Sequence, residues 1–305
     1  MTTLELPSGS VFECPDQWEE LTSYQVDKIM RLAVSYNKGI VSYDHFIVKA
    51  FYLIAKIKRG CRSIIKEKLL SRMDREEKFA SINILADKLS AFLFEQTTAE
   101  NSNQDKGQKV FKFDSVLNFI PDFKLGFKRF FGPKSMISDL SFGEFRHAIE
   151  AMTAFFKDGD EKQLSRMIAI LYRPKNPKYP AHFNYGRIRE PLNMVLVEKY
   201  AKPIDKLPEH MRYIILIWFT NCIKVIKEAE LDVDGRLISF SPLFPVLQPG
   251  EKPSAGIGWT GILYGVAKQG LFGDVKKTDD MDLFTVLLFM YDNHLQIQKQ
   301  STPQP

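Results

Sequence analysis

The chain has 305 residues, of which 45% are hydrophobic and 26% are charged; this composition is typical of a globular protein and excludes a disordered or collagen-like chain. Its 42 Lys and Arg against 37 Asp and Glu leave a formal net charge of +5, which is too small to indicate nucleic-acid binding unless the charges cluster. The cysteines Cys14, Cys61 and Cys222 are odd in number and far apart, which argues against a disulfide framework or a zinc site.

The N-terminal region, residues 1–94, is predicted to be helical after an extended start. Residues 1–20 carry neither a basic nor an apolar signal region, so we expect no secretory signal and an intracellular, reducing setting. A short strand is predicted around Ser10 to Glu13. Thr22 with Gln25 forms a capping box, and Ser42 can cap a second helix.

A third helical region is predicted over residues 62–94, where apolar residues return at helical spacing. Its densely charged part, 66–78, is typical of a solvated helix face. Residues 95–108 have almost nothing to bury and are predicted to form a mobile loop and an internal boundary. The alternation in 109–113 then indicates a half-buried strand, followed by short strands or irregular structure to 131.

The pattern of residues 139–174 predicts two antiparallel helices, and it is the strongest signal of secondary structure in the sequence. Ser141 and Glu144 form a capping box, and Asp160 with Gln163 repeats that pattern before the second helix. Both helices carry an apolar stripe that must be covered. We expect this hairpin to pack against residues 208–228, a helix that is apolar on all sides around Trp218 and therefore buried.

Prolines and glycines divide the rest of the chain. Residues 173–189 contain three prolines and cannot be a helix, and a short helix is predicted over 190–200. The proline- and glycine-rich connection 231–258 contains Asp234-Gly235, which predicts a small β-hairpin. Two helices, 259–269 and 278–298, are expected to end the chain.

The predicted fold is therefore mostly α, an irregular multi-helix bundle built on αα-hairpins with a few short β-strands. Five segments are expected: an N-terminal helical region (1–94), a mobile loop (95–108), a central helical core (109–230), a Pro/Gly-rich connection (231–258) and a C-terminal helical pair with a tail (259–305).

The sequence contains no convincing motif for catalysis, metal binding or phosphate binding. The five histidines lie in separate segments without metal-ligand spacing, and no nucleophile elbow or phosphate loop is present. Residues 256–261 are glycine-rich but lack the preceding strand and the following Lys-Ser/Thr. We therefore expect no catalytic residue, no metal and no cofactor.

Two stretches, 123–134 and 173–189, combine basic and aromatic residues. Such mixtures can hold single-stranded nucleic acid by phosphate contact and base stacking. They can also be surfaces for a protein partner, or lysine-decorated loops over a core. The sequence leaves these three interpretations open.

Three short patterns follow one another along the chain: residues 18–22 (WEELT), Gly132-Pro133 followed by 140–145, and 164–174 ending in LYRP. Together they resemble helical proteins encoded in phage and prophage clusters of Bacteroidetes-type bacteria. The C-terminal residues 258–267 and 270–273 resemble the ends of small tail-assembly proteins.

This resemblance implies a non-enzymatic morphogenesis protein, a chaperone-like or connector component that contacts other phage structural or assembly proteins in the bacterial cytoplasm. It leaves open whether the protein is retained in the virion. The expected contact surfaces are the 173–189 loop, with Arg187 and Arg189 exposed, and the helices from residue 259; no membrane contact is expected. The alternatives are a nucleic-acid-associated protein and an enzyme whose site is assembled from dispersed residues. The residues expected to bind the partner are Arg173, Lys178, Tyr179, Tyr185, Arg187, Arg189 and Trp259.

Overall fold

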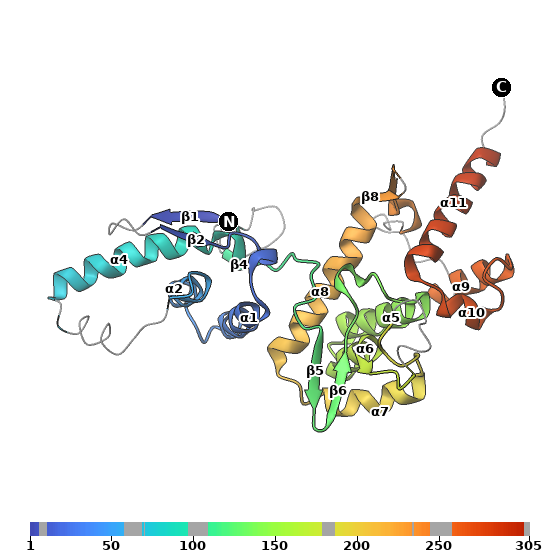
Figure 1. The fold of residues 1–305 in the computed structure, drawn as a ribbon, viewed down its shortest axis with the longest axis horizontal. Coiled ribbons are helices and arrows are strands. Elements are labelled where there is room, and N and C mark those ends of the chain that lie inside the picture. Colours follow the sequence, from blue (N-terminus) through green and yellow to red (C-terminus); the bar gives the residue numbers. More distant parts are fainter. Residues whose placement is uncertain are drawn as a thin grey trace. The chain divides into compact units, whose positions relative to one another are not determined.

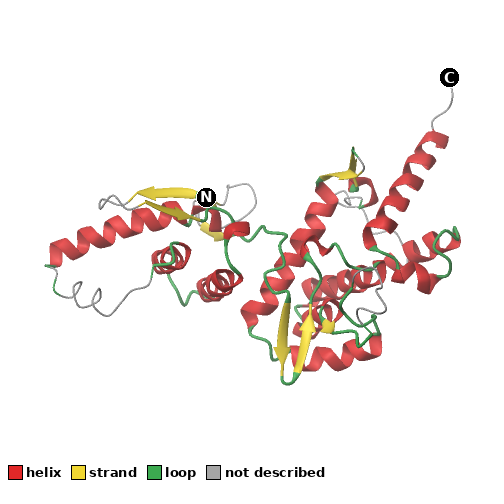
Figure 2. Cartoon of the chain, viewed as in Figure 1, coloured by secondary structure: helices red, strands yellow, loops and turns green. Residues whose placement is uncertain are grey.

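The computed structural model describes residues 1–5, 11–57, 69, 71–96, 109–178, 187–233, 235–244 and 258–301. These residues form a mostly helical protein with four small antiparallel sheets, which confirms the predicted fold class (Figures 1 and 2). The chain divides into two compact units. Unit 1 comprises Met1–Ser115 with Glu209–Ile214, and unit 2 comprises Val116–Pro208 with Ile215–Pro305.

Unit 1 is built from three described α-helices and two strand pairs. The first pair, β1 with β2, confirms the strand expected near residue 11. The elements are β1 (Thr2–Glu5), β2 (Val11–Cys14), α1 (Ser23–Asn37), α2 (Tyr43–Ile54), α4 (Arg72–Leu89), β3 (Phe94–Gln96) and β4 (Lys109–Phe111).

The helix starts of unit 1 follow the predicted caps. Thr22 and Gln25 form the complete capping box at α1, and the Ser42 hydroxyl accepts from the amide of His45 at α2. The third helix begins at Arg72 within the described residues, and Phe79 on it is 42% exposed.

Strands β3 and β4 pair with each other in antiparallel fashion, and both belong to unit 1. Residues 97–108 of the predicted mobile loop lie outside the described residues.

Unit 2 contains the predicted αα-hairpin. Helix α6 packs against α5 on one side and α7 on the other (Figure 1). The elements are β5 (Asp122–Leu125), β6 (Lys128–Phe131), α5 (Phe142–Asp158), α6 (Glu161–Leu171), β7 (Arg173–Pro174), α7 (Met194–Ile204), α8 (Glu209–Glu228, of which Glu209–Ile214 belongs to unit 1), β8 (Glu230–Val233), β9 (Arg236–Ser239), α9 (Trp259–Lys268), α10 (Val275–Asp280) and α11 (Leu283–Ser301).

The caps of the αα-hairpin are largely as predicted. Ser141 and Glu144 form the capping box at the start of α5, and Gly159 ends this helix with a φ of +66°, a conformation that glycine adopts without strain. Asp160 caps α6 by accepting from the amide of Lys162, without the expected return bond from Gln163.

Helix α8 is buried around Trp218, as predicted. The Trp218 side chain is 1% exposed, and its indole N–H donates to the carbonyl of Val116 over 2.9 Å. Cys222 is a core residue, and burial raises the pKa of its thiol to about 12. Within the described residues, neither α8 nor any other helix combines the length and apolarity needed for a membrane span.

The C-terminal end differs from the prediction of one helix over 278–298. Two helices, α10 and α11, are separated by Met281 and Asp282. The amide of Phe142 donates to the Met281 carbonyl over 2.9 Å, and the amide of Leu283 donates to the Leu140 carbonyl over 3.0 Å. This short antiparallel bridge attaches the C-terminal helices to the start of α5 and explains the break.

Candidate functional site

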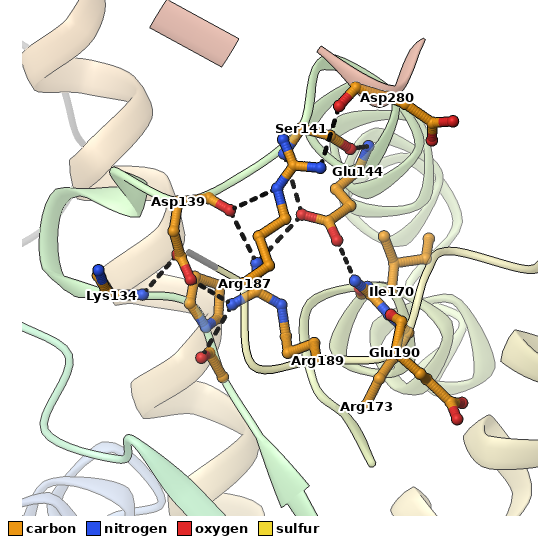
Figure 3. A network of polar contacts seen from close by, with 12 residues as sticks. Lys134, Asp139, Ser141, Glu144, Ile170, Arg173, Arg187, Arg189, Glu190 and Asp280 are labelled. Atoms are coloured by element: carbon orange, nitrogen blue, oxygen red, sulfur yellow. Dashed lines mark hydrogen bonds and ion pairs between the residues drawn. The ribbon is translucent and has the colours of Figure 1, made fainter. Parts of the chain in front are cut away.

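The three arginines of the 173–189 loop lie inside unit 2 instead of on its surface (Figure 3). Arg173, Arg187 and Arg189 are 1%, 7% and 2% exposed. The expectation that Arg187 and Arg189 are exposed is therefore wrong. The physical reason is that buried carboxylates and carbonyls surround the guanidinium groups.

Backbone pairing brings these arginines together. Strand β7, which contains Arg173, pairs with β6 at the edge of the β5-β6-β7 sheet. Residues on either side of the loop also pair: Lys175 and Arg189 form an antiparallel bridge, and the amide of Asn176 donates to the carbonyl of Ile188 over 2.9 Å. The two ends of the loop therefore run side by side.

Glu144 is the first anchor of this network. One of its carboxylate oxygens accepts from Arg173, and the other accepts from Arg189 over 3.2 Å and from the Ser141 amide over 3.0 Å. Burial alone would raise the pKa of Glu144, but the guanidinium groups of Arg173, Arg189 and Arg187 lower it to about 2. Glu144 is therefore a permanent anion at neutral pH.

Asp139 is the second anchor. Its side chain accepts from Arg189 over 2.8 Å and from the Lys134 amide over 2.7 Å. Its backbone carbonyl accepts from Arg187 over 3.2 Å, and Arg187 also donates to the Asp280 carbonyl of α10 over 3.0 Å. The network thus connects β7, the start of α5 and the end of α10.

The space beside the network is too small for an organic ligand. The cavity next to Arg187 and Arg189 measures about 20 Å³, room for about one water molecule. Arg173 also donates to the Ile170 and Glu190 carbonyls, so its guanidinium is fully used inside the protein. The geometry is that of a clamp that holds chain segments together.

The other residues predicted to bind a partner are not gathered at one place. Lys178 is exposed, whereas Tyr179 and Tyr185 lie outside the described residues. Trp259 is half-buried, with its ring 5.5 Å from that of Phe145 and 6.2 Å from that of Phe142. Trp259 therefore packs α9 onto α5.

The second basic aromatic stretch forms the β5–β6 hairpin, and here an aromatic side chain is presented to solvent. Phe123 and Phe130 pair across the strands and are buried, whereas Lys124 and Lys128 are exposed. Phe127 at the turn is fully exposed. Strand alternation places Lys124 and Arg129 on the face opposite to Phe123 and Phe130. Lys128 shares the face of Phe130 but is exposed at the end of the strand next to the turn.

The turn of this hairpin has two residues, Gly126 and Phe127. Gly126 has a φ of +59°, while Phe127 does not have a positive φ, as in a type II′ turn with glycine at its first position. Since Leu125 and Lys128 already pair with each other, only Gly126 and Phe127 connect the strands, and Phe127 lies at the tip of the hairpin.

Contacts at the base make the hairpin rigid. Arg129 donates to Asp122 through two bonds of 2.7 and 2.8 Å across the strands. The Phe130 ring lies 5.5 Å from that of Tyr200 on α7, and the Lys128 ammonium lies 5.5 Å from the same ring. The pKa of Tyr200 is raised to about 12, mainly by burial and to a smaller extent by a hydrogen bond with Glu190.

The sequence analysis identified this stretch as basic and aromatic, but it did not identify Phe127 as the exposed residue at the tip of a hairpin. A signal was present: a Gly-Phe pair between two alternating runs predicts a two-residue turn. No comparable signal links Arg189 to Glu144, because the two are 45 residues apart in the chain.

No group of three or more His, Cys, Asp or Glu side chains suited to a metal ion was found in the part of the chain that the structure describes. Comparisons with protein families, with curated proteins and with solved structures gave no match.

Proposed function

We propose that this chain is a non-enzymatic phage or prophage morphogenesis protein, a tail-assembly chaperone-like or connector component that contacts other assembly proteins in the bacterial cytoplasm. The sequence resemblance motivates this proposal. The exposed ring of Phe127, at the tip of a rigid hairpin, is the structural observation that supports an action through protein contacts.

An exposed phenylalanine on a fixed backbone is suited to anchor an interface. Aromatic side chains dominate interface energetics, and burying one phenylalanine contributes about 1.5–3 kcal/mol. The Arg129–Asp122 pair and the turn already fix the hairpin, so little backbone entropy is lost when it docks. The matching partner surface is an apolar pocket bordered by acidic groups, because Lys124 and Lys128 flank the tip and are exposed.

The nucleic-acid alternative uses the same hairpin, with a base stacked on Phe127 and phosphates on the lysines. The arginines weigh against it. Arg129 is paired with Asp122, and Arg173, Arg187 and Arg189 are buried, so four of the cations in the two basic stretches bond within the protein. A protein partner is therefore the better supported interpretation.

Phe127→Ser tests the proposal when the protein is co-expressed with each of the proteins encoded beside it. We expect a phage structural protein to co-purify with the wild type and to be lost with Phe127→Ser. Phe156→Ser is the matched control, because Phe156 on α5 is 60% exposed and lies outside the hairpin.

Two results would contradict the proposal. One is that no neighbouring protein co-purifies with the wild type. The other is tight binding of single-stranded DNA at about 150 mM salt, where exposed phosphate contacts are already screened, together with its loss in Phe127→Ser; that result would favour the nucleic-acid alternative.

A further inference from the structure

Unit 1 contains a pocket that neither the arginine network nor the hairpin involves. It measures about 410 Å³, within the size range of ligand sites. Its lining comes from the turn that contains Trp18, from the end of the α4 region and β3, and from the residues that follow β4. All of these segments belong to unit 1.

One part of the pocket lining is aromatic. Phe92 and Phe94 are half-buried there, and Trp18 is 1% exposed. The Trp18 and Phe92 rings meet edge to face at 5.9 Å. Further rings fix Trp18 from the interior side, with Phe113 at 4.6 Å. These groups form a preformed apolar surface that a side chain can cover.

The remaining lining is predominantly acidic. The lining contains four carboxylates, those of Asp16, Glu19, Glu95 and Asp114, and one ammonium group, that of Lys112. Lys112 is paired with Asp114 over 2.9 Å, and Asp16 is paired with the N-terminal ammonium over 3.1 Å. Glu95 interacts with Lys112 through charge but forms no direct ion pair with it, and Glu19 has no ion-pair partner within the described residues. Four carboxylates against two ammonium groups leave the pocket with net negative charge.

The ring of Trp18 also provides a probe of the pocket. Its indole N–H is buried and has no acceptor in the described part of the chain, so the NMR signal of this group reports on the environment of the ring.

We propose that this pocket binds a lysine or arginine side chain from a basic peptide segment of a partner protein. The aliphatic stem lies on the aromatic lining, and the cation lies among the carboxylates. A cation beside aromatic rings gains a further attraction from the ring faces. Anionic ligands such as nucleic acid are repelled by the same charges. This proposal concerns unit 1 and is independent of the assembly role, whose test concerns Phe127 in unit 2.

The experiment uses the full chain and short capped glycine peptides with one central arginine or lysine. Binding is followed by NMR through the indole N–H signal of Trp18. We expect a saturable shift with both cationic peptides. Peptides with citrulline or norleucine at the same position, which keep the shape but lack the charge, should give no saturable shift.

The double variant Glu19→Gln/Glu95→Gln should weaken binding of the arginine peptide about tenfold, since it removes two exposed charge partners. Both residues are exposed, so the fold should be retained. Glu77→Gln, at an exposed glutamate of α4 outside the pocket, is the matched control and should bind as the wild type does. The proposal is overturned if citrulline binds as well as arginine, if the double variant binds unchanged, or if no peptide shifts the Trp18 signal.

Discussion

Arg173 donates to Glu144 within unit 2, and both side chains are almost fully buried. The pair joins the strand that follows α6 to the first turn of α5. Glu144 thereby closes the αα-hairpin at one end while it also completes the capping box of α5. One carboxylate serves both the local helix start and the tertiary packing.

Removing the charge of Glu144 should therefore be costly. Glu144→Gln leaves the guanidinium groups of Arg173 and Arg189 buried without their shared counterion, which typically costs about 3–5 kcal/mol. Urea unfolding should show this loss in the transition of unit 2. Glu150→Gln removes a 44% exposed partner of Arg146 and should cost less than about 1 kcal/mol. Equal losses in the two variants would show that the buried network does not stabilise the fold.

The same carboxylate predicts a pH dependence. The pKa of Glu144 falls from an ordinary 4.5 to about 2 in the folded protein. Because the folded pKa is the lower one, this stabilisation is present above about pH 4.5 and is lost as the pH falls toward 2, in total roughly 3 kcal/mol. Burial raises the pKa of nearby Asp280, which acts in the opposite direction.

Denaturant unfolding between about pH 6 and pH 3 measures this effect. The wild type should lose more stability over this range than Glu144→Gln does. In the wild type, the carboxyl carbon of Glu144 should keep the NMR shift of an ionised group to well below pH 4. Titration of Glu144 with an ordinary pKa would contradict the prediction.

The geometry of Arg189 gives a third prediction. Its two terminal nitrogens donate to the Gly132 carbonyl, to Asp139 twice and to Glu144, over 2.8 to 3.2 Å. A lysine ammonium cannot span these acceptors, so Arg189→Lys should cost about 2–4 kcal/mol although it keeps the charge.

Arg129→Lys is the matched control, because Arg129 also makes a two-bond contact with an aspartate but is 52% exposed. It should cost at most about 1 kcal/mol, measured by the same unfolding experiment. If both substitutions are equally mild, the buried contacts of Arg189 contribute no more than a surface pair does.

Local signals in the sequence were sufficient for much of the fold. The capping boxes at Thr22 and Ser141 are present as predicted, and β8 and β9 form the predicted hairpin, with Gly235 at a φ of +76° between them. These features depend on residues within a few positions of each other, where side-chain and backbone geometry are fixed by the helix or turn itself.

Arg187 and Arg189 were predicted to be exposed because their partners are distant in sequence. Arg187 bonds to the carbonyls of Asp139 and Asp280, 48 and 93 residues away. Composition favours the surface for an arginine next to prolines and lysines, and only tertiary structure supplies the buried acceptors. The break between α10 and α11 has the same origin, since it depends on backbone bonds to residues 140 and 142.

Two glycines offer a matched pair of substitutions that tests the packing of unit 2. A Cβ on Gly132 would lie 2.3 Å from the ring of Tyr172, far inside van der Waals contact. That ring is buried, and its hydroxyl is bonded to Asn118 over 3.1 Å and to the Ile120 carbonyl over 2.8 Å, so it cannot move away without losing these bonds. Gly132→Ala should therefore destabilise the protein by about 1–3 kcal/mol.

Gly265 lies within α9, and a Cβ there meets no atom within 4 Å. Gly265→Ala should stabilise the protein by about 0.5–1 kcal/mol, because alanine favours the helix and glycine does not. Thermal unfolding of the two variants should thus give melting temperatures on opposite sides of that of the wild type. A Gly132→Ala protein as stable as the wild type would mean that Tyr172 does not occupy the position against β6 that the structure gives it.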